Sequence, residues 1–451
     1  MINMVYPSDY ENKTGFDRIR AQVRGKCTTD VGRALLDGEG FSASAGEIAH
    51  RLSLCSELQE ILMLESGFPL QEYTDIGPVA RKIEVAGTFL DIEDMIALRA
   101  GLGAVNEITV FLAAKEEGRY PVLRGLAQGV ESFPEITGHI DTILDRYGKI
   151  KDSASPELYT IRRTIRDREG QVSKRLQAIL SKAQKDGYAD ADAAVSIRDG
   201  RAVIPVSAAN KRKINGFIHD ESATGKTFYI EPVEIVEINN ELKELEYAER
   251  REVVRILTAF TDRIRPDAPG IARAGEYLAC MDMIRAKARW AAENECVKPV
   301  LSEEGTLWLR SARHPLLRQT LAREGKQVVP LDLKLDRGRR MLVISGPNAG
   351  GKSVCLKTVG LLQYMFQCGF PVPVLENSEF PVFDGIFIDI GDEQSIDNDL
   401  STYSSHLLNM KHMLAGAGSG SLVLIDEFGS GTEPVIGGAI AEAILERFWG
   451  T

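Results

Sequence analysis

The segment MLVISGPNAGGKSVCLKTVGLL, residues 341–362, decides the fold of this chain. It contains a glycine, four further residues and then Gly-Lys-Ser at 346–353, which is the complete phosphate-binding loop pattern. The apolar run at 341–344 predicts a buried strand before the loop, and the apolar positions within 354–367 predict a helix after it. A strand, a glycine-rich loop and a helix in this order indicate a parallel α/β nucleotide-binding sheet.

The loop chemistry favours a nucleotide over an ordinary glycine-rich turn before a helix. Glycines let the backbone curl so that N–H groups point at phosphate oxygens, and the helix N-terminus adds partial positive charge. Lys352 is placed to reach the β and γ phosphates, and Ser353 offers a hydroxyl to Mg²⁺. We therefore expect ATP and Mg²⁺ as cofactors. The predicted cofactor-binding residues are Gly346, Pro347, Asn348, Ala349, Gly350, Gly351, Lys352 and Ser353.

A second element, LVLIDE at 422–427, places two acids at the end of an apolar strand. Ligands of open α/β sheets bind at the carboxyl ends of the strands. Asp426 is a candidate Mg²⁺ ligand, through a water, and Glu427 is a candidate general base for the attacking water. An ordinary acid pair at a strand end is the alternative, but the phosphate loop upstream disfavours it. Glu427 and Lys352 are the predicted catalytic residues.

A cluster of small hydroxyl side chains lies in DLSTYSSH, residues 399–406. Such residues cap helices, and this pattern predicts a helix start. A capped helix N-terminus is also a suitable second phosphate ligand, including across a dimer interface. Ser401 and Thr402 are therefore candidate contacts to the ATP of a partner copy.

Two long charged segments, residues 157–188 and 232–264, carry narrow apolar stripes typical of a coiled-coil seam. Their matched lengths predict two antiparallel helices that form an arm. Between them, β-branched runs and the Asp199-Gly200 dipeptide predict three or four antiparallel strands at the tip of the arm.

The tip is basic, although the whole chain has a formal net charge of −11. Residues 198–226 contain six basic side chains and three acidic ones. A solvated hairpin surface would explain this charge, and so would contact with a polyanion backbone. The candidate nucleic-acid contacts are Arg198, Arg201, Lys211, Arg212, Lys213 and Lys226.

Composition sets the broad class. A chain of 451 residues with 44% hydrophobic and 26% charged residues is typical of folded, multidomain proteins. Its six cysteines form no CxxC pair, which disfavours a structural zinc site or a disulfide framework. We find no signal peptide and no apolar run of about 20 residues, so we expect a cytoplasmic protein without membrane contact.

Through these motifs the chain resembles the MutS family of ATPases. Within that family it resembles the second bacterial subfamily, here called MutS-two. The resemblance extends from about residue 15 to the end of the chain. It rests on the three motifs above and on further matching segments. These are SARHPLL, KDSASPELYTIRR, IRDGRAVIPV, FIHDESATGKTFYIEP, DIGDEQSIDNDLSTYSSH and LVLIDEFGSGTEP.

The resemblance implies two ATPase heads that sandwich two ATP molecules, with the arm and its tip as lever and clamp. It implies an ATP-gated clamp on branched or duplex DNA, in suppression of recombination, or on collided ribosomes. Because the helical core begins almost at residue 1, we expect no mismatch-reading domain. The family fold and its small nuclease domain would continue beyond Thr451, so we expect a fragment without nuclease activity. We expect it to be mainly monomeric, with impaired hydrolysis, whereas the full-length protein forms a homodimer.

The expected fold is multidomain α + α/β. It comprises a helical core at 1–155 with 266–295, a coiled-coil lever at 156–265 with a β clamp at 194–231, and an incomplete ABC/MutS-type P-loop ATPase domain at 296–451. Two other functions remain open, a small-molecule P-loop kinase and a structural arm protein with an inactive ATP site. A kinase needs neither the acid pair nor the arm, and the intact loop and acid residues disfavour an inactive site.

Overall fold

The computed structural model of the chain describes residues 4–346, 351–390, 402–429 and 433–450. The chain divides into two compact units. The first comprises residues up to Asp75, Ala100–Ser132 and the part from Arg273 onward, and the second comprises Ile76–Arg99 and Phe133–Ala272. The predicted domain boundaries were drawn from the sequence pattern and stay a prediction.

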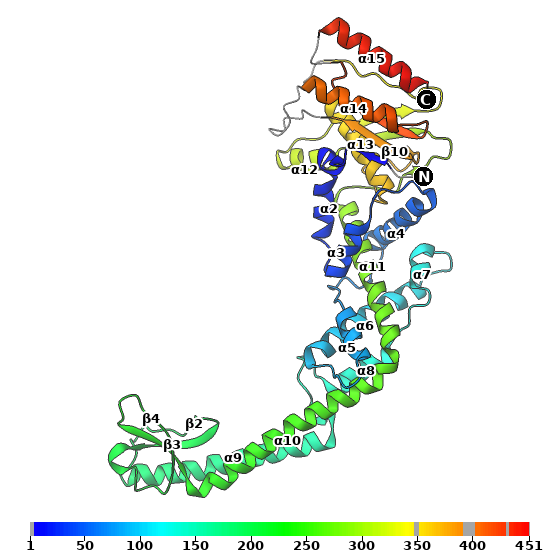
Figure 1. Cartoon of the computed structure of the whole chain (residues 1–451). Coiled ribbons are helices and arrows are strands. Elements are labelled where there is room, and N and C mark those ends of the chain that lie inside the picture. Colours follow the sequence, from blue (N-terminus) through cyan, green and yellow to red (C-terminus); the bar gives the residue numbers. More distant parts are fainter. Residues whose placement is uncertain (1–3, 347–350, 391–401, 430–432, 451) are drawn as a thin grey trace. The chain divides into compact units, whose positions relative to one another are not determined.

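The first unit contains the segments predicted to bind a nucleotide (Figure 1). Its helices are α1 (Tyr10–Thr14), α2 (Phe16–Arg24), α3 (Asp30–Gly38), α4 (Ala45–Leu64), α7 (Pro121–Ala127), α12 (Pro315–Arg323), α13 (Lys352–Gln367), α14 (Thr402–Gly416) and α15 (Pro434–Trp449). Its strands are β1 (Met4–Tyr6), β6 (Val300–Leu301), β7 (Leu307–Ala312), β8 (Leu331–Leu335), β9 (Glu379–Phe380), β10 (Gly385–Asp389) and β11 (Ser421–Ile425). Helices α6 (Ile92–Ala113) and α11 (Ala268–Glu293) have residues in both units.

A parallel sheet of order β1-β10-β11 lies beside the helix that follows the phosphate loop. Side chains alternate between its two faces, as the period of two in a strand requires. Ile388 and Leu424 pack into the large core that contains α13, whereas Phe387 and Val423 pack with α14 and α15. The sheet is therefore covered by helices on both faces, which is the usual condition of a parallel sheet.

Helix α13, which follows the phosphate loop, is buried along its whole second half, from Thr358 to Gln367. The Tyr10 hydroxyl donates to the Gly360 carbonyl oxygen at 2.9 Å, an approach that the missing Cβ of glycine permits. The rings of Phe16 and Tyr364 pack edge to face with centroids 5.1 Å apart. The N-terminal helices thus belong to the same core as the phosphate-loop helix, which the sequence pattern did not predict.

A second sheet in this unit has the order β6-β9-β7-β8. Its strands β7 and β8 are antiparallel, and buried Leu307 and Leu309 face the core shared with α13. Three of its four strands lie between residues 300 and 335, before the phosphate loop in the sequence.

The strand predicted at 341–344 is not formed. These residues have no strand hydrogen bonds, and their side chains are 36–73% exposed. The apolar pattern was compatible with a buried strand, but a strand also needs a neighbour to pair with. Within the described residues, no strand of the β1-β10-β11 sheet pairs with this segment.

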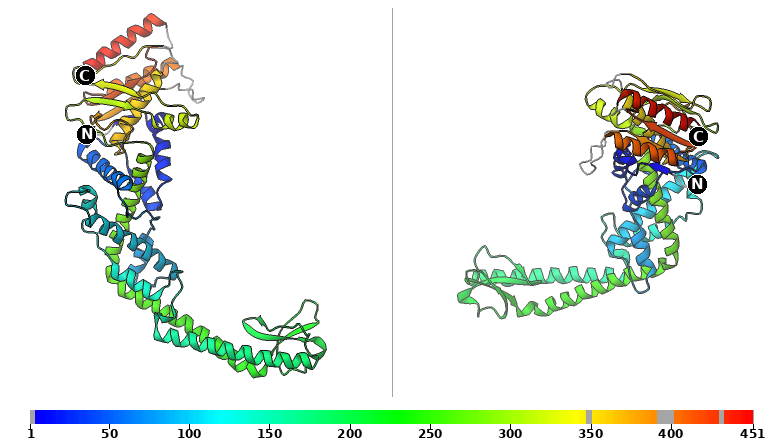
Figure 2. Two further views of the ribbon diagram at one scale, coloured as in Figure 1. Left: turned by 180° about the vertical axis from the view of Figure 1, so that it is seen from behind. Right: turned by 45° about the horizontal axis from the view of Figure 1, so that its top comes forward.

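The second unit contains the two predicted long helices, α9 (Pro156–Lys185) and α10 (Val233–Ile264), which run side by side in opposite directions (Figures 1 and 2). Its other helices are α5 (Gly77–Glu84) and α8 (Pro134–Ile143), and its strands are β2 (Ser196–Arg198), β3 (Arg201–Ser207), β4 (Gly216–Glu221) and β5 (Thr227–Pro232). The strands form one antiparallel sheet of order β2-β3-β5-β4. Buried Leu176 of α9, Ile235 of α10 and Ile230 of β5 share one core, which fixes the sheet against the helix ends.

The predicted turn at Asp199-Gly200 is confirmed. Asp199 and Gly200 both adopt positive φ, 47° and 73°, and Arg198 pairs with Arg201 across the two-residue loop. Two left-handed residues match the twist of the flanking strands, which explains the Asp-Gly sequence.

Helix α6 is the one helix in the described part of the chain that is long and apolar enough to cross a membrane, by length and composition alone. Core helices pass the same test. Buried Met95, Leu102 and Ile108 show that α6 packs inside the protein.

His314, in the SARHPLL segment, caps helix α12. Its Nδ1 accepts a hydrogen bond from the Leu317 N–H at 3.4 Å, so Nδ1 must be unprotonated. Burial, and next the nearby positive charges of Arg18 and Lys357, lower the pKa of His314 to about 4. The folded state therefore requires the neutral form of the His314 side chain.

We predict that acid destabilises the first unit through this side chain. The unfolded pKa of histidine is about 6.5, so the unfolded chain takes up the proton first. The stabilisation is complete above that pH and is lost as the pH falls toward 4, with about 2 kcal/mol lost by pH 5. The H314N variant keeps a capping side chain without the titration and should lack this component. Urea unfolding followed by tryptophan fluorescence at pH 7.5 and 5.0 measures it, because all three tryptophans lie in the first unit. Equal pH dependence in both proteins would contradict the assignment.

Candidate functional site

The phosphate loop ends in a geometry that suits an anion. Gly351 is the N-cap residue of α13 with φ of 85°, and Gly346 has φ of 153°, both unfavourable for residues with a Cβ. The Lys352 ammonium donates to the Gly346 carbonyl oxygen at 2.5 Å, so the lysine spans the two ends of the loop. Ser353 is exposed in the first turn of α13. Pro347, Asn348, Ala349 and Gly350 lie outside the described residues.

The predicted acid pair follows β11. Asp426 is 8% exposed, and its N–H donates to the Asp389 carbonyl oxygen at 2.8 Å. Its own Oδ1 accepts the Glu427 N–H at 3.0 Å. Glu427 is exposed and has φ of 51°. A left-handed conformation in a residue other than glycine costs on the order of 1 kcal/mol and is concentrated at functional sites.

These residues fit a magnesium nucleotide. Leu422 and Leu424 face the α13 core, and continuation of the same alternation places Asp426 toward the phosphate-loop side of the sheet. A helix N-terminus with a lysine binds phosphates, and a hydroxyl with a carboxylate suits Mg²⁺. Among the described residues, no group of three or more His, Cys, Asp or Glu side chains is arranged to hold a metal ion alone.

The structure adds a cluster that the sequence analysis missed. Asp389, at the end of β10, is 2% exposed and accepts hydrogen bonds from two side chains of α14. His406 Nδ1 donates to its Oδ2 at 2.6 Å, and Asn409 Nδ2 donates to its Oδ1 at 2.9 Å. The Tyr6 hydroxyl of β1 donates to Asn409 Oδ1 at 2.7 Å. The signal was a histidine and an asparagine three residues apart, on the helix that begins with the hydroxyl cluster.

The helix expected after the hydroxyl cluster is present as α14, and Thr402 is its first residue. Ser401 lies outside the described residues, and the position of the Thr402 side chain is not described. Their contact with a partner's nucleotide stays a prediction.

The basic residues of the tip, on the β2–β5 sheet, differ in their surroundings. Arg198 forms an ion pair with Asp220 at 3.1 Å and lies over the Tyr229 ring. Lys211 lies over the Phe228 ring, with its ammonium 4.4 Å from the ring centroid. These two side chains combine a positive charge with an aromatic face.

Arg201 has a different environment, because it is paired with buried Glu231. Its guanidinium contacts both carboxylate oxygens at 2.7 and 2.9 Å, and His219 and Asn239 bind the same carboxylate at 2.6 and 2.8 Å. Burial alone raises the pKa of Glu231, but the hydrogen bonds from Asn239, Arg201 and His219 outweigh it, so the pKa is lowered. Arg201 thus stabilises the sheet, and its charge is already neutralised.

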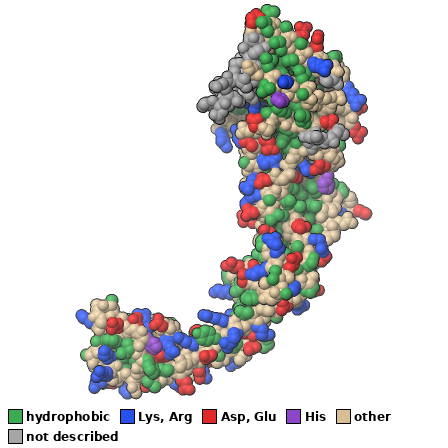
Figure 3. Space-filling model, in the orientation of Figure 1, with side chains coloured by type: hydrophobic (Ala, Val, Ile, Leu, Met, Phe, Trp, Pro, Cys, Tyr) green, Lys and Arg blue, Asp and Glu red, His purple; other side chains and the backbone are tan. Residues whose placement is uncertain are grey.

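Arg212, Lys213 and Lys226 are exposed, and none of them has an ion-pair partner among the described residues. Basic side chains gather at the end of the second unit that carries the sheet, with acidic ones among them (Figure 3). The exposed part of the predicted basic surface is therefore formed by Arg212, Lys213 and Lys226.

The sequence of the chain is similar to those of known proteins along most of its length. Residues 342–450 match the family described as MutS domain V. The chain is 36% identical over 437 residues to the "Endonuclease MutS2" of Geobacillus sp. (strain WCH70), covering 96% of this chain and 55% of that protein. It is 39% identical over 392 residues to the protein of that name from Pelotomaculum thermopropionicum, covering 87% and 49% respectively. The chain spans about half the length of the curated relatives that it matches.

Proposed function

The chain belongs to the MutS2 subfamily of the MutS family, and from this premise we propose that it is an ATPase whose nucleotide state controls a clamp on nucleic acid or nucleoprotein. The observation that carries the ATPase part is the combination of Lys352 across the phosphate loop with Asp426 and Glu427 at the end of β11.

Each residue of this combination has a distinct role in the proposal. Lys352 and the N-terminus of α13 bind phosphate oxygens, and Ser353 and Asp426 hold the magnesium ion. Glu427 accepts a proton from the attacking water, as its exposed carboxylate allows. Mg-ATP, when bound, supplies the phosphoryl group and a charge that offsets that of the phosphates.

We further propose that Ser401 and Thr402 complete the site of a second copy, so that full activity needs a homodimer. The position of Thr402 at the start of α14 supports this, because a helix N-terminus is an anion-binding element. The name endonuclease describes the longer relatives. We assign only the ATPase part to the described residues, and we expect the protein in the cytoplasm.

The second unit supplies the proposed lever and clamp. Helices α9 and α10 pack along each other, and the sheet at their ends presents Lys211, Arg212, Lys213 and Lys226. Exposed positive charge on a small sheet suits the phosphate backbone of DNA or of ribosomal RNA.

We predict that K352A weakens ATP binding by at least about 2 kcal/mol, or roughly 30-fold, because a charge-assisted contact to phosphate is lost. E427Q should bind ATP normally and lose hydrolysis, because the amide cannot accept the proton. Nucleotide titration and phosphate release measure the two effects.

The matched control is K411A, which removes an exposed lysine of α14 in the same unit and should change neither quantity. Unchanged ATP affinity in K352A would contradict the nucleotide assignment. Phosphate release by E427Q at the rate of the unaltered chain would contradict the role of Glu427.

We also predict that reversing Lys211, Arg212 and Lys213 to Glu weakens binding to a branched DNA or to bacterial ribosomes. Three lost phosphate contacts should flatten the slope of log affinity against log salt by about 2–3. ATP binding by the first unit should be unaffected. Filter binding and co-sedimentation at several salt concentrations measure the slope.

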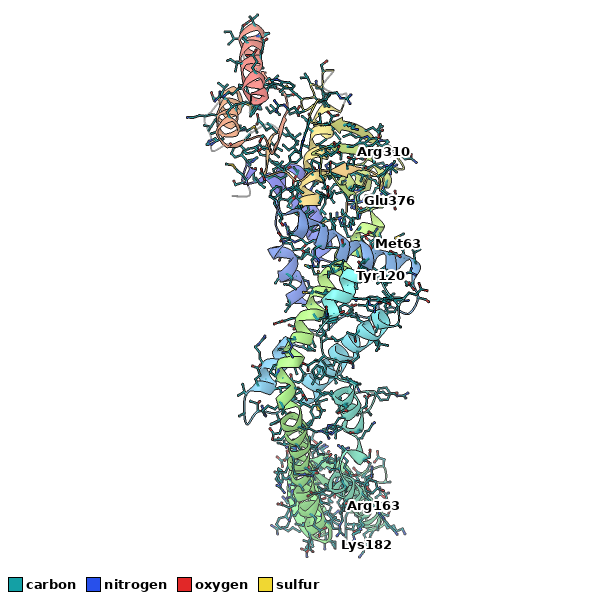
Figure 4. All side chains as sticks on the ribbon, turned by 90° about the vertical axis from the view of Figure 1, so that its right-hand side faces the viewer. Met63, Tyr120, Arg163, Lys182, Arg310 and Glu376 are labelled. Atoms are coloured by element: carbon teal, nitrogen blue, oxygen red, sulfur yellow. The ribbon has the colours of Figure 1, made fainter. Side chains whose placement is uncertain are left out.

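The control reverses Lys174, Lys182 and Lys185 of α9, an equal change of charge on exposed positions of the same unit (Figure 4 labels Lys182). An equal loss of binding in both variants would mean that net charge, and not the tip, controls the interaction. Retention of affinity and slope in the tip variant would exclude the tip as the contact surface.

A further inference from the structure

Asp389 connects strand β10 to helix α14, and both elements lie near the acid pair. Its carboxylate is buried and receives one hydrogen bond from His406 and another from Asn409, both on α14. A carboxylate only accepts hydrogen bonds, so His406 Nδ1 carries the proton in this contact. The other ring nitrogen, Nε2, is left for a second contact.

Asp389 is also the last residue of β10, the strand that pairs with β11 and so lies beside the acid pair. It lies opposite Ile425 in the parallel ladder, and its carbonyl oxygen accepts the Asp426 N–H. Glu427 follows in its left-handed conformation. A strained backbone of this kind persists only where the surrounding structure holds it.

A cavity of about 20 Å³ lies beside this strained segment, and Asp389, His406, Met410, Asp426 and Glu427 contribute to its wall. A space of this size accommodates about one water molecule. His406 is therefore the donor to Asp389 that borders the cavity, whereas Asn409 connects Asp389 to Tyr6 at the edge of the sheet.

We propose that His406 is a positioning residue for hydrolysis. Through Asp389 it holds the end of β10, and through the Asp389–Asp426 hydrogen bond it holds Glu427 in its left-handed conformation. The inference rests on the proposed ATPase function and adds to it a residue from outside both nucleotide motifs.

Three substitutions test this proposal in the whole chain. In H406L the donor to Asp389 is lost, so the rate of single-turnover ATP hydrolysis should fall at least tenfold while the ATP dissociation constant changes less than twofold. In H406N the side-chain amide can take the place of Nδ1, so most of the rate should return. In N409L the other oxygen of the same carboxylate loses its donor, which should lower thermal stability about as much as H406L does but leave the rate within threefold.

The readouts separate positioning from simple packing. Similar losses of rate in H406L and N409L would overturn the proposal, because general docking of α14 would then explain both. An unchanged rate in H406L, or no recovery in H406N, would also overturn it. Failure of the unaltered chain to bind or hydrolyse ATP would instead contradict the proposed function itself.

Discussion

The burial of α13 between the parallel sheet and the N-terminal helices is the constraint on which the rest of the first unit depends. One end of this helix carries Lys352 and has to meet a ligand, whereas its second half is enclosed by protein. Buried Gln367 donates to the carbonyl oxygens of Ser42 and Phe383, so the enclosed end is also held by directional contacts. A helix held in this way can position Lys352 and its own N-terminus for a ligand.

Both units use a buried carboxylate with several donors as a junction. Asp389 joins the sheet to α14, and Glu231 joins β5 to β3, β4 and α10 through Arg201, His219 and Asn239. A carboxylate removed from water is costly unless its lone pairs are all occupied. Such a junction therefore allows few arrangements of the residues around it. In this way a small sheet can hold the side chains at its edge in fixed positions.

The sequence predicted the elements whose signals are local. The helix after the phosphate loop, the two long helices, the Asp199-Gly200 turn and the strand ending at Ile425 all follow from patterns of a few residues. The segment 341–344 shows the limit of that reasoning, because strand formation depends on a partner that periodicity does not reveal. The burial of the N-terminal aromatic residues against α13 could not be predicted from local patterns either.

The residues of the candidate site also divide into those that the sequence predicted and those that it did not. Lys352, Asp426 and Glu427 could be selected because their spacing and their place beside apolar runs carry the chemistry. The pair of His406 and Asp389 could not, because 17 residues separate them and no local spacing shows that the two side chains meet. Arg201 illustrates the opposite case. Its positive charge is visible in the sequence, but its ion pair with Glu231 is not.

Strand β1 has a consequence for synthesis of the chain. Met4–Tyr6 pairs with Gly385–Phe387, so its partner leaves the ribosome some 380 residues later. At about 5–20 residues per second, the N-terminal strand waits roughly 20–80 seconds for its place in the sheet. Tyr10 and Phe16 wait with it, because α13 is also translated late. The second unit, whose sheet closes within some 40 residues, can form first. Residues 4–16 are thus translated long before they are buried, and until then their aromatic side chains are a natural target for chaperones.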